Sequence, residues 1–245
     1  MVLDRQESPE YIDWMFLRLI QEVLHAVPSQ CMVCHAWPAQ TICEDCVNRF
    51  AQPQLRCQTC AMPVPLSVPQ CGDCIKHAPA LDACLAAVPY AFPWSDLITR
   101  YKFHNQTGLA GAFALLLRST PWVEPALDAA DWVLPMPLSS ERLRQRGFNQ
   151  ALLLASQLAP QKVDSRLLLR IRDTAPQSSL KRAQRLGALD DAFAVEPLLA
   201  GLLKGKRIVL LDDVMTSGAS LFAAARVLRS AGAAHITGLV VARTE

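Results

Sequence analysis

Long uncharged apolar runs are missing from this chain of 245 residues. A membrane-spanning helix needs about 20 consecutive apolar residues, but charged residues interrupt the most apolar stretch near the N-terminus, residues 11–28. Acidic residues also precede this stretch, where an export signal would carry positive charge. We therefore predict an N-terminal amphipathic helix over residues 1–28, no membrane insertion and a cytoplasmic location.

The chain also lacks a strong excess of charge of either sign. Its formal net charge is +2 and 19% of its residues are charged, so bulk electrostatics do not indicate a nucleic-acid binder. Aromatic residues make up only 7%, and they are not interleaved with basic residues in the pattern that stacks single-stranded bases. Any basic binding surface must therefore be local.

Cysteine, in contrast, is concentrated in one segment. Four C-x-x-C pairs are formed by Cys31, Cys34, Cys43, Cys46, Cys57, Cys60, Cys71 and Cys74. Two thiolates at this spacing can bind one Zn²⁺, and a second pair completes a tetrahedral site. The eight cysteines therefore predict two structural zinc ions. Cys84 stands alone in an apolar stretch, which predicts a small buried core residue.

The sequence leaves the pairing of these cysteines open. Residues 31–46 and 57–74 form an internal repeat, which favours two sequential zinc ribbons over an interleaved arrangement. Disulfides would need an oxidising compartment, and a redox motif would not need four copies. Because so short a segment cannot build much core, we predict a metal-stabilised module over residues 29–76.

The character of the chain changes after the last cysteine pair, around residues 77–88. Apolar runs predict strands over residues 81–92, 131–138, 166–172, 207–214 and 235–244. Helical patterns cover residues 97–120, with an interruption near Gly108, and residues 147–160 and 218–234. This alternation predicts right-handed βαβ crossovers and a mostly parallel sheet in an α/β domain over residues 85–245.

Two carboxylates and a hydroxyl-rich turn come directly after the strand predicted at residues 207–214. Asp212 and Asp213 would lie at its carboxyl end, where open α/β sheets bind ligands. The turn at residues 215–220 would present free backbone N–H groups and hydroxyls to a phosphate at the start of a helix. The acids cannot bind that phosphate, but they suit sugar hydroxyls or Mg²⁺. A ribose 5-phosphate satisfies both halves.

The stretch VLLDDVMTSGAS, residues 209–220, resembles the 5-phosphoribosyl-1-pyrophosphate (PRPP) signature of type I phosphoribosyltransferases. LPMPLSSERLRQRGFNQ, residues 134–150, and RIRDTAPQSSLKRAQR, residues 170–185, narrow this resemblance. Together with the cysteine segment, they resemble the ComF/GntX family of bacterial competence and DNA-utilisation proteins. The resemblance implies a type I phosphoribosyltransferase-like parallel sheet flanked by helices and preceded by a small zinc-ribbon module.

The resemblance also implies roles for individual residues. Asp212 and Asp213 would bind the ribose hydroxyls and Mg²⁺ of PRPP or of a phosphoribosyl nucleotide. The residues around the 5-phosphate would be Thr216, Ser217, Gly218, Ala219 and Ser220. Family members more often have TTGAT where this chain has TSGAS, a change that keeps the hydroxyls and the small residues.

Two polar segments could bind pyrophosphate or a DNA backbone through charge-assisted hydrogen bonds. Their candidate residues are Arg142, Arg144, Arg146, Asn149, Gln150, Lys181 and Arg182. A solvated charged surface would explain the basic residues equally, and Asn149 and Gln150 also suit the start of a helix.

Two classes of function stay open. The first is a protein of DNA uptake or utilisation that holds incoming single-stranded DNA or its nucleotides for competence or recombination proteins. The second is an active phosphoribosyltransferase that acts on a nucleobase with PRPP and magnesium. No catalytic residue and no base can be identified from the sequence, and we favour the DNA-linked role.

Overall fold

The computed structural model describes residues 29–172 and 192–245. The predicted amphipathic helix at residues 1–28 and the candidate residues Lys181 and Arg182 lie outside these ranges. The chain divides into a smaller unit that ends at Val47 and a larger unit that runs from Asn48 to Glu245. This division falls between the two cysteine repeats, whereas the sequence suggested one module over residues 29–76. The predicted domain boundaries remain predictions.

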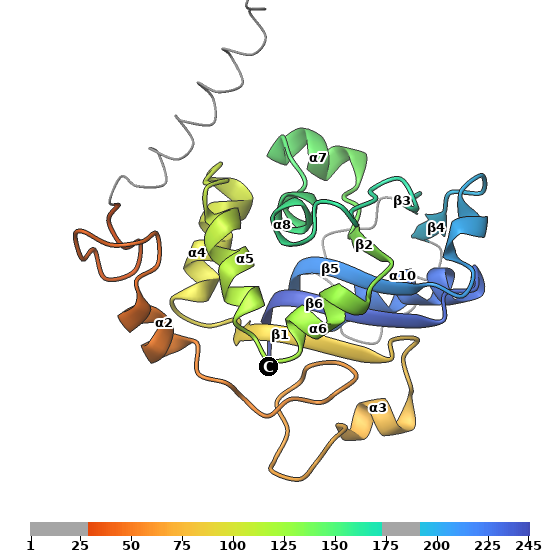
Figure 1. Cartoon of the computed structure of the whole chain (residues 1–245), viewed down its shortest axis with the longest axis horizontal. Coiled ribbons are helices and arrows are strands. Elements are labelled where there is room, and N and C mark those ends of the chain that lie inside the picture. Colours follow the sequence, from red (N-terminus) through yellow and green to blue (C-terminus); the bar gives the residue numbers. More distant parts are fainter. Residues whose placement is uncertain (1–28, 173–191) are drawn as a thin grey trace, which may run out of the picture. The chain divides into compact units, whose positions relative to one another are not determined.

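The larger unit is built on a four-stranded parallel sheet (Figure 1). Its spatial order is β1-β6-β5-β2. The strands are β1 (Ala83–Pro89), β6 (His235–Arg243), β5 (Arg207–Met215) and β2 (Trp132–Pro135). Almost every residue of the central strand β6 is buried, which explains its continuous apolar run. The α/β class and the parallel sheet are confirmed.

Helices connect and cover these strands. They are α4 (Trp94–Phe103), α5 (Leu109–Arg118), α6 (Val123–Ala129), α7 (Ser140–Arg146), α8 (Gln150–Leu158) and α10 (Ala219–Ser230). The predicted interruption near Gly108 separates α4 from α5. The sequence did not predict α6 and α7, because seven residues are too few to show a clear helical period. Within the two described ranges, no helix is both long and apolar enough to span a bilayer.

The segment predicted as a strand at residues 166–172 does not join the main sheet. It contributes β3 (Leu168–Arg170), which pairs antiparallel with β4 (Phe193–Val195) in a separate two-stranded sheet. The sequence did not predict β4, because three residues show no usable alternation. Three further short helices complete the described chain: α2 (Glu44–Phe50), α3 (Gly72–Lys76) and the 3₁₀ helix η2 (Ala200–Leu203).

The core lies on both faces of the sheet, because successive side chains of a strand point to opposite faces. On β5, Ile208 and Leu210 belong to the cluster of buried residues that includes the inner side of α10. Val209 and Leu211 are equally buried and point to the other face. Cys84 on β1 is buried in the first of these layers, which confirms its prediction as a small core residue.

Candidate functional site

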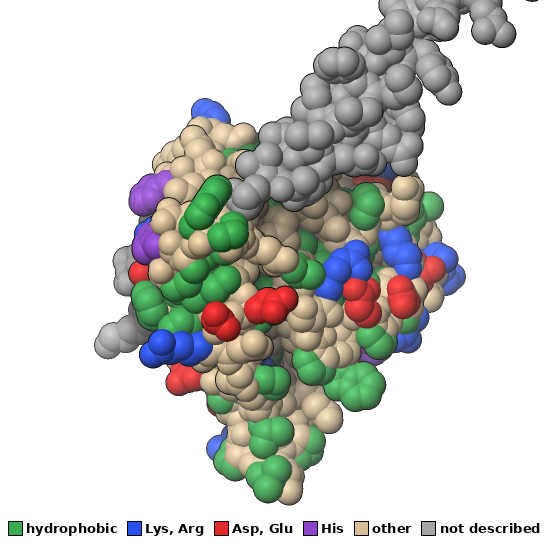
Figure 2. All heavy atoms as spheres, turned by 60° about the vertical axis from the view of Figure 1, so that its left-hand side comes forward, with side chains coloured by type: hydrophobic (Ala, Val, Ile, Leu, Met, Phe, Trp, Pro, Cys, Tyr) green, Lys and Arg blue, Asp and Glu red, His purple; other side chains and the backbone are tan. Residues whose placement is uncertain are grey.

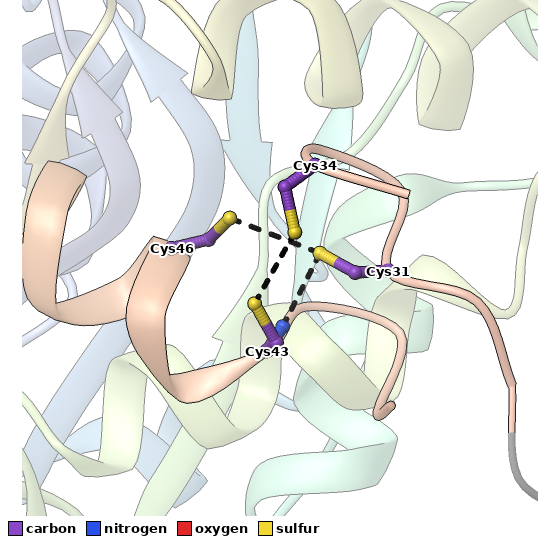
Figure 3. Close-up of side chains that lie close together, drawn as sticks. All are labelled: Cys31, Cys34, Cys43 and Cys46. Atoms are coloured by element: carbon purple, nitrogen blue, oxygen red, sulfur yellow. Dashed lines mark hydrogen bonds between the residues drawn. The ribbon is translucent and has the colours of Figure 1, made fainter. Parts of the chain in front are cut away.

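In the smaller unit, the first four cysteines converge on one point (Figure 3). All four sulfurs lie within 4.8 Å of one another. The Sγ atoms of Cys34 and Cys43 are 3.6 Å apart, and the backbone N–H of Cys43 donates to the Sγ of Cys31 at 3.4 Å. Four sulfurs at this spacing, with N–H groups directed at a sulfur, fit a tetrahedral metal ion.

The larger unit holds the second set, Cys57, Cys60, Cys71 and Cys74, with the same close approach of the four sulfurs. The Sγ atoms of Cys60 and Cys71 are 3.6 Å apart, and the N–H of Cys71 donates to the Sγ of Cys57 at 3.3 Å. The sulfurs therefore group sequentially, as the internal repeat favours. The two clusters can each hold one metal ion such as zinc.

Each cluster contains a thiol that ionises readily. Burial raises the pKa of Cys31, but hydrogen bonds from the backbone of Cys34, Cys43 and Val33 outweigh it and lower that pKa to about 6. In the second cluster, burial likewise raises the pKa of Cys57, and backbone hydrogen bonds lower it to about 7. Because the thiolate is the form that binds metal, these backbone hydrogen bonds favour the metal-binding form of one cysteine in each cluster.

The two acidic residues lie near the carboxyl end of β5, where the sequence placed them. An Oδ1 atom of Asp213 is 2.8 Å from the Nζ of Lys102, and both side chains are largely buried. Lys102 comes from α4 and was not a candidate from the sequence. A buried carboxylate needs a positively charged partner, so the sequence could have indicated that such a residue exists. It could not have indicated which lysine or arginine this is.

Asp212 has a different environment from its neighbour. Burial raises its pKa from the ordinary value of 3.8 to about 7, and the negative charge of Asp213 adds to the rise. Lys102, the N–H of Asp213 and Arg146 act in the opposite direction. Burial and the neighbouring charge therefore favour the protonated form of this carboxyl. A cation or hydroxyl donors would stabilise its charged form.

The segment between β5 and α10 is a tight turn with a glycine at its critical position. Gly218 has a φ of +80° and begins the turn into α10. A Cβ atom at this position would lie 2.5 Å from the Cε of Met215 and 2.6 Å from the Cζ of Phe222. The left-handed backbone and the close packing therefore both favour glycine at this position, and a side chain here would have to displace Met215 or Phe222.

This turn (residues 216–220), which we call the phosphate loop after the ligand proposed below, offers backbone donors. Among the described residues, the N–H groups of Thr216, Ser217 and Gly218 have no hydrogen-bond partner, and the N–H of Ala219 makes only a long contact of 3.4 Å with the Oγ of Ser217. A small cavity of about 30 Å³ is lined by Asp212 and the loop. A carboxylate and several N–H donors therefore face the same space.

Beside the acid pair lies a second, wider cavity of about 400 Å³, which we call the basic groove. It is lined by Lys102, Phe103, Asn105, Arg144, Gln145, Arg146, Gly147 and Phe148. The guanidinium of Arg146 stacks 4.9 Å from the ring centre of Phe103, whose side chain is 62% exposed. An aromatic face and cations are thus brought together from α4 and the end of α7, which no local sequence pattern shows.

The remaining candidates of this segment have distinct environments. Asn149 caps α8, because its Oδ1 accepts from the N–H of Leu152 at 3.2 Å while its Nδ2 donates to the carbonyl of Met136. Gln150 is buried, and its Oε1 accepts from Arg146 at 3.0 Å. Its Nε2 is the buried side-chain donor that lacks a partner within the described chain. Arg142 is not part of the groove lining.

One face of the molecule carries surface charge of both signs. Figure 2 shows basic and acidic side chains side by side on one face of the molecule, without a broad field of either sign. This agrees with the net charge of +2. Attraction of an anionic ligand must therefore come from local groups such as those of the basic groove.

Comparisons with known proteins agree with this geometry. Residues 145–244 match the family described as phosphoribosyl transferase domain. The chain is 32% identical over 232 residues to the DNA utilization protein YhgH of Salmonella typhimurium, covering 89% of this chain and 98% of that protein. The chain belongs to the ComF/GntX family. It is also 31% identical to the competence protein F of Haemophilus influenzae, over 74% of this chain and 81% of that protein, and 29% identical to the competence protein ComFC of Bacillus subtilis, over 84% and 86%.

In this ComF/GntX protein, the matched domain accounts for only part of the site. Residues 145–244 include Arg146, the acid pair and the phosphate loop. Lys102 and Phe103 precede the matched region, although they contact Asp213 and Arg146. The site is therefore completed by a segment that the phosphoribosyltransferase signature does not identify.

Proposed function

We propose that this ComF/GntX protein binds the phosphoribosyl group of nucleotides, or the 5′-phosphate of single-stranded DNA ends, during DNA utilisation in the cytoplasm. The observation that carries this proposal is the juxtaposition of the acid pair, the phosphate loop and the basic groove in one unit. A nucleotide has a 5′-phosphate, a sugar and a base, and a DNA strand or PRPP has further phosphates. The site contains side chains or backbone groups that suit each of these parts.

The 5′-phosphate would bind the free N–H groups of the phosphate loop at the start of α10. Asp212 and Asp213 would bind the ribose hydroxyls of a nucleotide together with Mg²⁺. At a DNA end, which lacks these free hydroxyls, the two carboxylates would act through the Mg²⁺ ion bound to the 5′-phosphate. Lys102 neutralises Asp213 in the described structure, so a bound cation would compete with it or share that carboxylate. Magnesium would supply charge neutralisation between phosphate and carboxylate oxygens.

The basic groove would hold the base and the further phosphates of the ligand. Lys102, Arg144 and Arg146 suit phosphodiester or pyrophosphate oxygens, and the exposed face of Phe103 suits a nucleobase. The relatives' names concern DNA utilization and competence, which favours a strand of DNA as the natural occupant. Contacts of this kind tolerate any base sequence.

The two cysteine clusters would bind zinc with a structural role. Each supplies a full set of four sulfurs, whereas catalytic zinc keeps a coordination position open. Binding to competence or recombination proteins is part of the same proposal.

The test is to compare short DNA strands that differ only at the 5′ end. Fluorescence anisotropy with a labelled 3′ end should show that a 5′-phosphorylated strand binds more tightly than the same strand with a 5′-hydroxyl, and that Mg²⁺ increases the difference. Asp212→Asn with Asp213→Asn should remove the effect of Mg²⁺. Equal binding of both strands would contradict the proposal.

Phosphoribosyl transfer to a nucleobase is the second candidate, because the match of residues 145–244 is to a transferase domain. It predicts release of pyrophosphate from PRPP when a suitable base and Mg²⁺ are present. Pyrophosphate release that requires Asp212 and Asp213 and that occurs with one particular nucleobase would favour this function over DNA binding.

A further inference from the structure

Arg243 is a buried arginine at the end of β6 that contacts two other segments of the chain. Its side chain is surrounded by backbone carbonyls, and the residue is only 2% exposed. The Nε donates to the carbonyl of Cys60 at 2.9 Å. The Nη1 donates to the carbonyl of Met215 at 3.2 Å and also to those of Thr216 and Thr244. One guanidinium thus joins a metal ligand's backbone to the first residue of the phosphate loop.

The same two regions touch through a second route. The N–H of Cys84 donates to the carbonyl of Gln58 at 2.7 Å, and the Sγ of Cys84 lies 3.6 Å from the Sδ of Met215. The cluster of buried residues that holds Cys57 and Cys60 also holds Met215. The second cysteine cluster is therefore packed behind the phosphate loop, inside the same core.

The chemistry of arginine makes this contact sensitive to its surroundings. A guanidinium has donors only, and a buried cation must be satisfied by acceptors. No carboxylate pairs with Arg243 in the described ranges of the chain, so carbonyl oxygens take that role. A metal ion bound by the four cysteines of the second cluster would fix the backbone of Cys60. If Cys60 shifts, Arg243 loses an acceptor and the carbonyl of Thr216 loses a fixed donor.

We propose that Arg243 is a positioning residue that couples metal binding at Cys57, Cys60, Cys71 and Cys74 to the conformation of the phosphate loop. The occupied cluster holds the Cys60 carbonyl, Arg243 holds the Thr216 carbonyl, and the loop N–H groups are thereby aimed at phosphate. Loss of the metal weakens phosphate binding without any change to the residues that contact phosphate. The expected loss of phosphate binding rests on the proposed function. The expected change in the conformation of the loop does not, and it can be measured without any ligand.

The conformational readout uses two amides that report whether the loop is closed. The N–H of Phe222 donates to the carbonyl of Gly218 at 2.8 Å, and the N–H of Thr244 donates to that of Met215 at 3.0 Å. Their hydrogen exchange in the full chain, without ligand, should be at least about 10-fold faster in Arg243→Met than in the wild type. Arg243→Met should retain both metal ions, as measured by metal analysis.

A double-mutant cycle separates coupling from general destabilisation. Cys71→Ser should lose the second metal ion and accelerate the same two amides. In the Arg243→Met background it should add little further acceleration, because the connection is already broken. Fully additive accelerations, or unchanged exchange in Arg243→Met, would overturn the proposal. If Arg243→Met does not fold, Arg243→Lys provides the same cycle with the charge kept.

Two matched controls accompany the cycle. Arg229→Met removes another arginine that donates to backbone carbonyls, those of Ala233 and Ala234, and Cys34→Ser removes a ligand of the first cluster. Both should leave exchange at Phe222 and Thr244 unchanged. Binding of ribose 5-phosphate is then measured separately. If the wild type does not bind ribose 5-phosphate, the proposed function is contradicted. The hydrogen-exchange measurements in the double-mutant cycle still decide whether the metal site and the loop are coupled.

Discussion

At the scale of single residues, Asp212 connects stability with binding. Its pKa rises from 3.8 to about 7 on folding, so the folded state binds more protons than the unfolded state between these values. The free energy of unfolding therefore falls as pH increases through this window. Asn cannot ionise, so Asp212→Asn removes this decrease in the free energy of unfolding. We expect it to be more stable than the wild type at pH 8, by on the order of 1 kcal/mol or more, in urea unfolding without Mg²⁺.

The neighbouring carboxylate is the matched control. Asp213 pairs with Lys102 at 2.8 Å, so Asp213→Asn leaves a largely buried ammonium without its partner. We expect this change to destabilise the protein by on the order of 2 kcal/mol at pH 8. An Asp212→Asn variant that is less stable than the wild type at both pH 5 and pH 8 would contradict the raised pKa assigned to Asp212.

Gly218 allows a second prediction at this scale. Gly218→Ala places a Cβ atom within 2.7 Å of the side chains of Met215 and Phe222 and keeps a positive φ. We expect a loss of on the order of 2 kcal/mol in stability and the loss of thermal protection by inorganic phosphate. Gly111→Ala, in α5, where the added Cβ meets nothing within 4 Å, should be neutral or stabilising. Retained phosphate protection in Gly218→Ala would argue against the loop as the phosphate site.

At the scale of helices and strands, the basic groove is proposed to make two kinds of contact with DNA, ionic contacts with phosphates and stacking on a base. Arg146→Ala should lower the salt dependence of DNA binding by about one phosphate contact. Phe103→Ala should weaken binding by about 1 to 3 kcal/mol and leave that salt dependence unchanged, because stacking releases no counterions. Anisotropy titrations at several salt concentrations measure both quantities. Arg142→Ala, outside the groove lining, is the control. A Phe103→Ala variant with wild-type affinity would exclude stacking on this ring.

Sequence patterns predicted the elements that are long and buried. The apolar runs of β5 and β6 and the helical period of α10 were sufficient, because burial on both faces requires continuous apolar residues. The acid pair and phosphate loop were also predictable, since both belong to one strand–turn–helix segment. Short elements such as α7 and β4 were not predicted, because tertiary contacts and caps stabilise them more than periodicity does. The Ser139 hydroxyl that accepts from the N–H of Arg142 at the start of α7 is one such cap.

At the scale of the whole molecule, the sequence could not show which distant segments meet. Lys102 and Phe103 at the end of α4 lie far along the chain from Arg146 at the end of α7 and from Asp213 on β5, and no local pattern links them. Similarly, the cysteine repeat predicted metal binding, but not that the second cluster shares a core with Met215. These contacts are long-range in the chain and result from the crossovers of the fold.

Metal content gives a prediction at this scale. The purified protein should contain two zinc ions per chain, because each set of four sulfurs lies within 4.8 Å. Cys57→Ser should lose the second ion, retain the first, and lower the melting temperature of the larger unit, since Cys57 is fully buried in its core. Loss of both ions together would contradict two independent sites.

The central claim is a phosphoribosyl site formed by Asp212, Asp213 and the phosphate loop. Calorimetric titration of the zinc-loaded protein with ribose 5-phosphate, with and without Mg²⁺, tests it most directly. We predict saturable binding at one site per chain that Mg²⁺ strengthens, that loses its Mg²⁺ dependence in Asp212→Asn with Asp213→Asn, and that disappears in Gly218→Ala. Absence of binding at millimolar ligand, or binding unchanged in both variants, would contradict it.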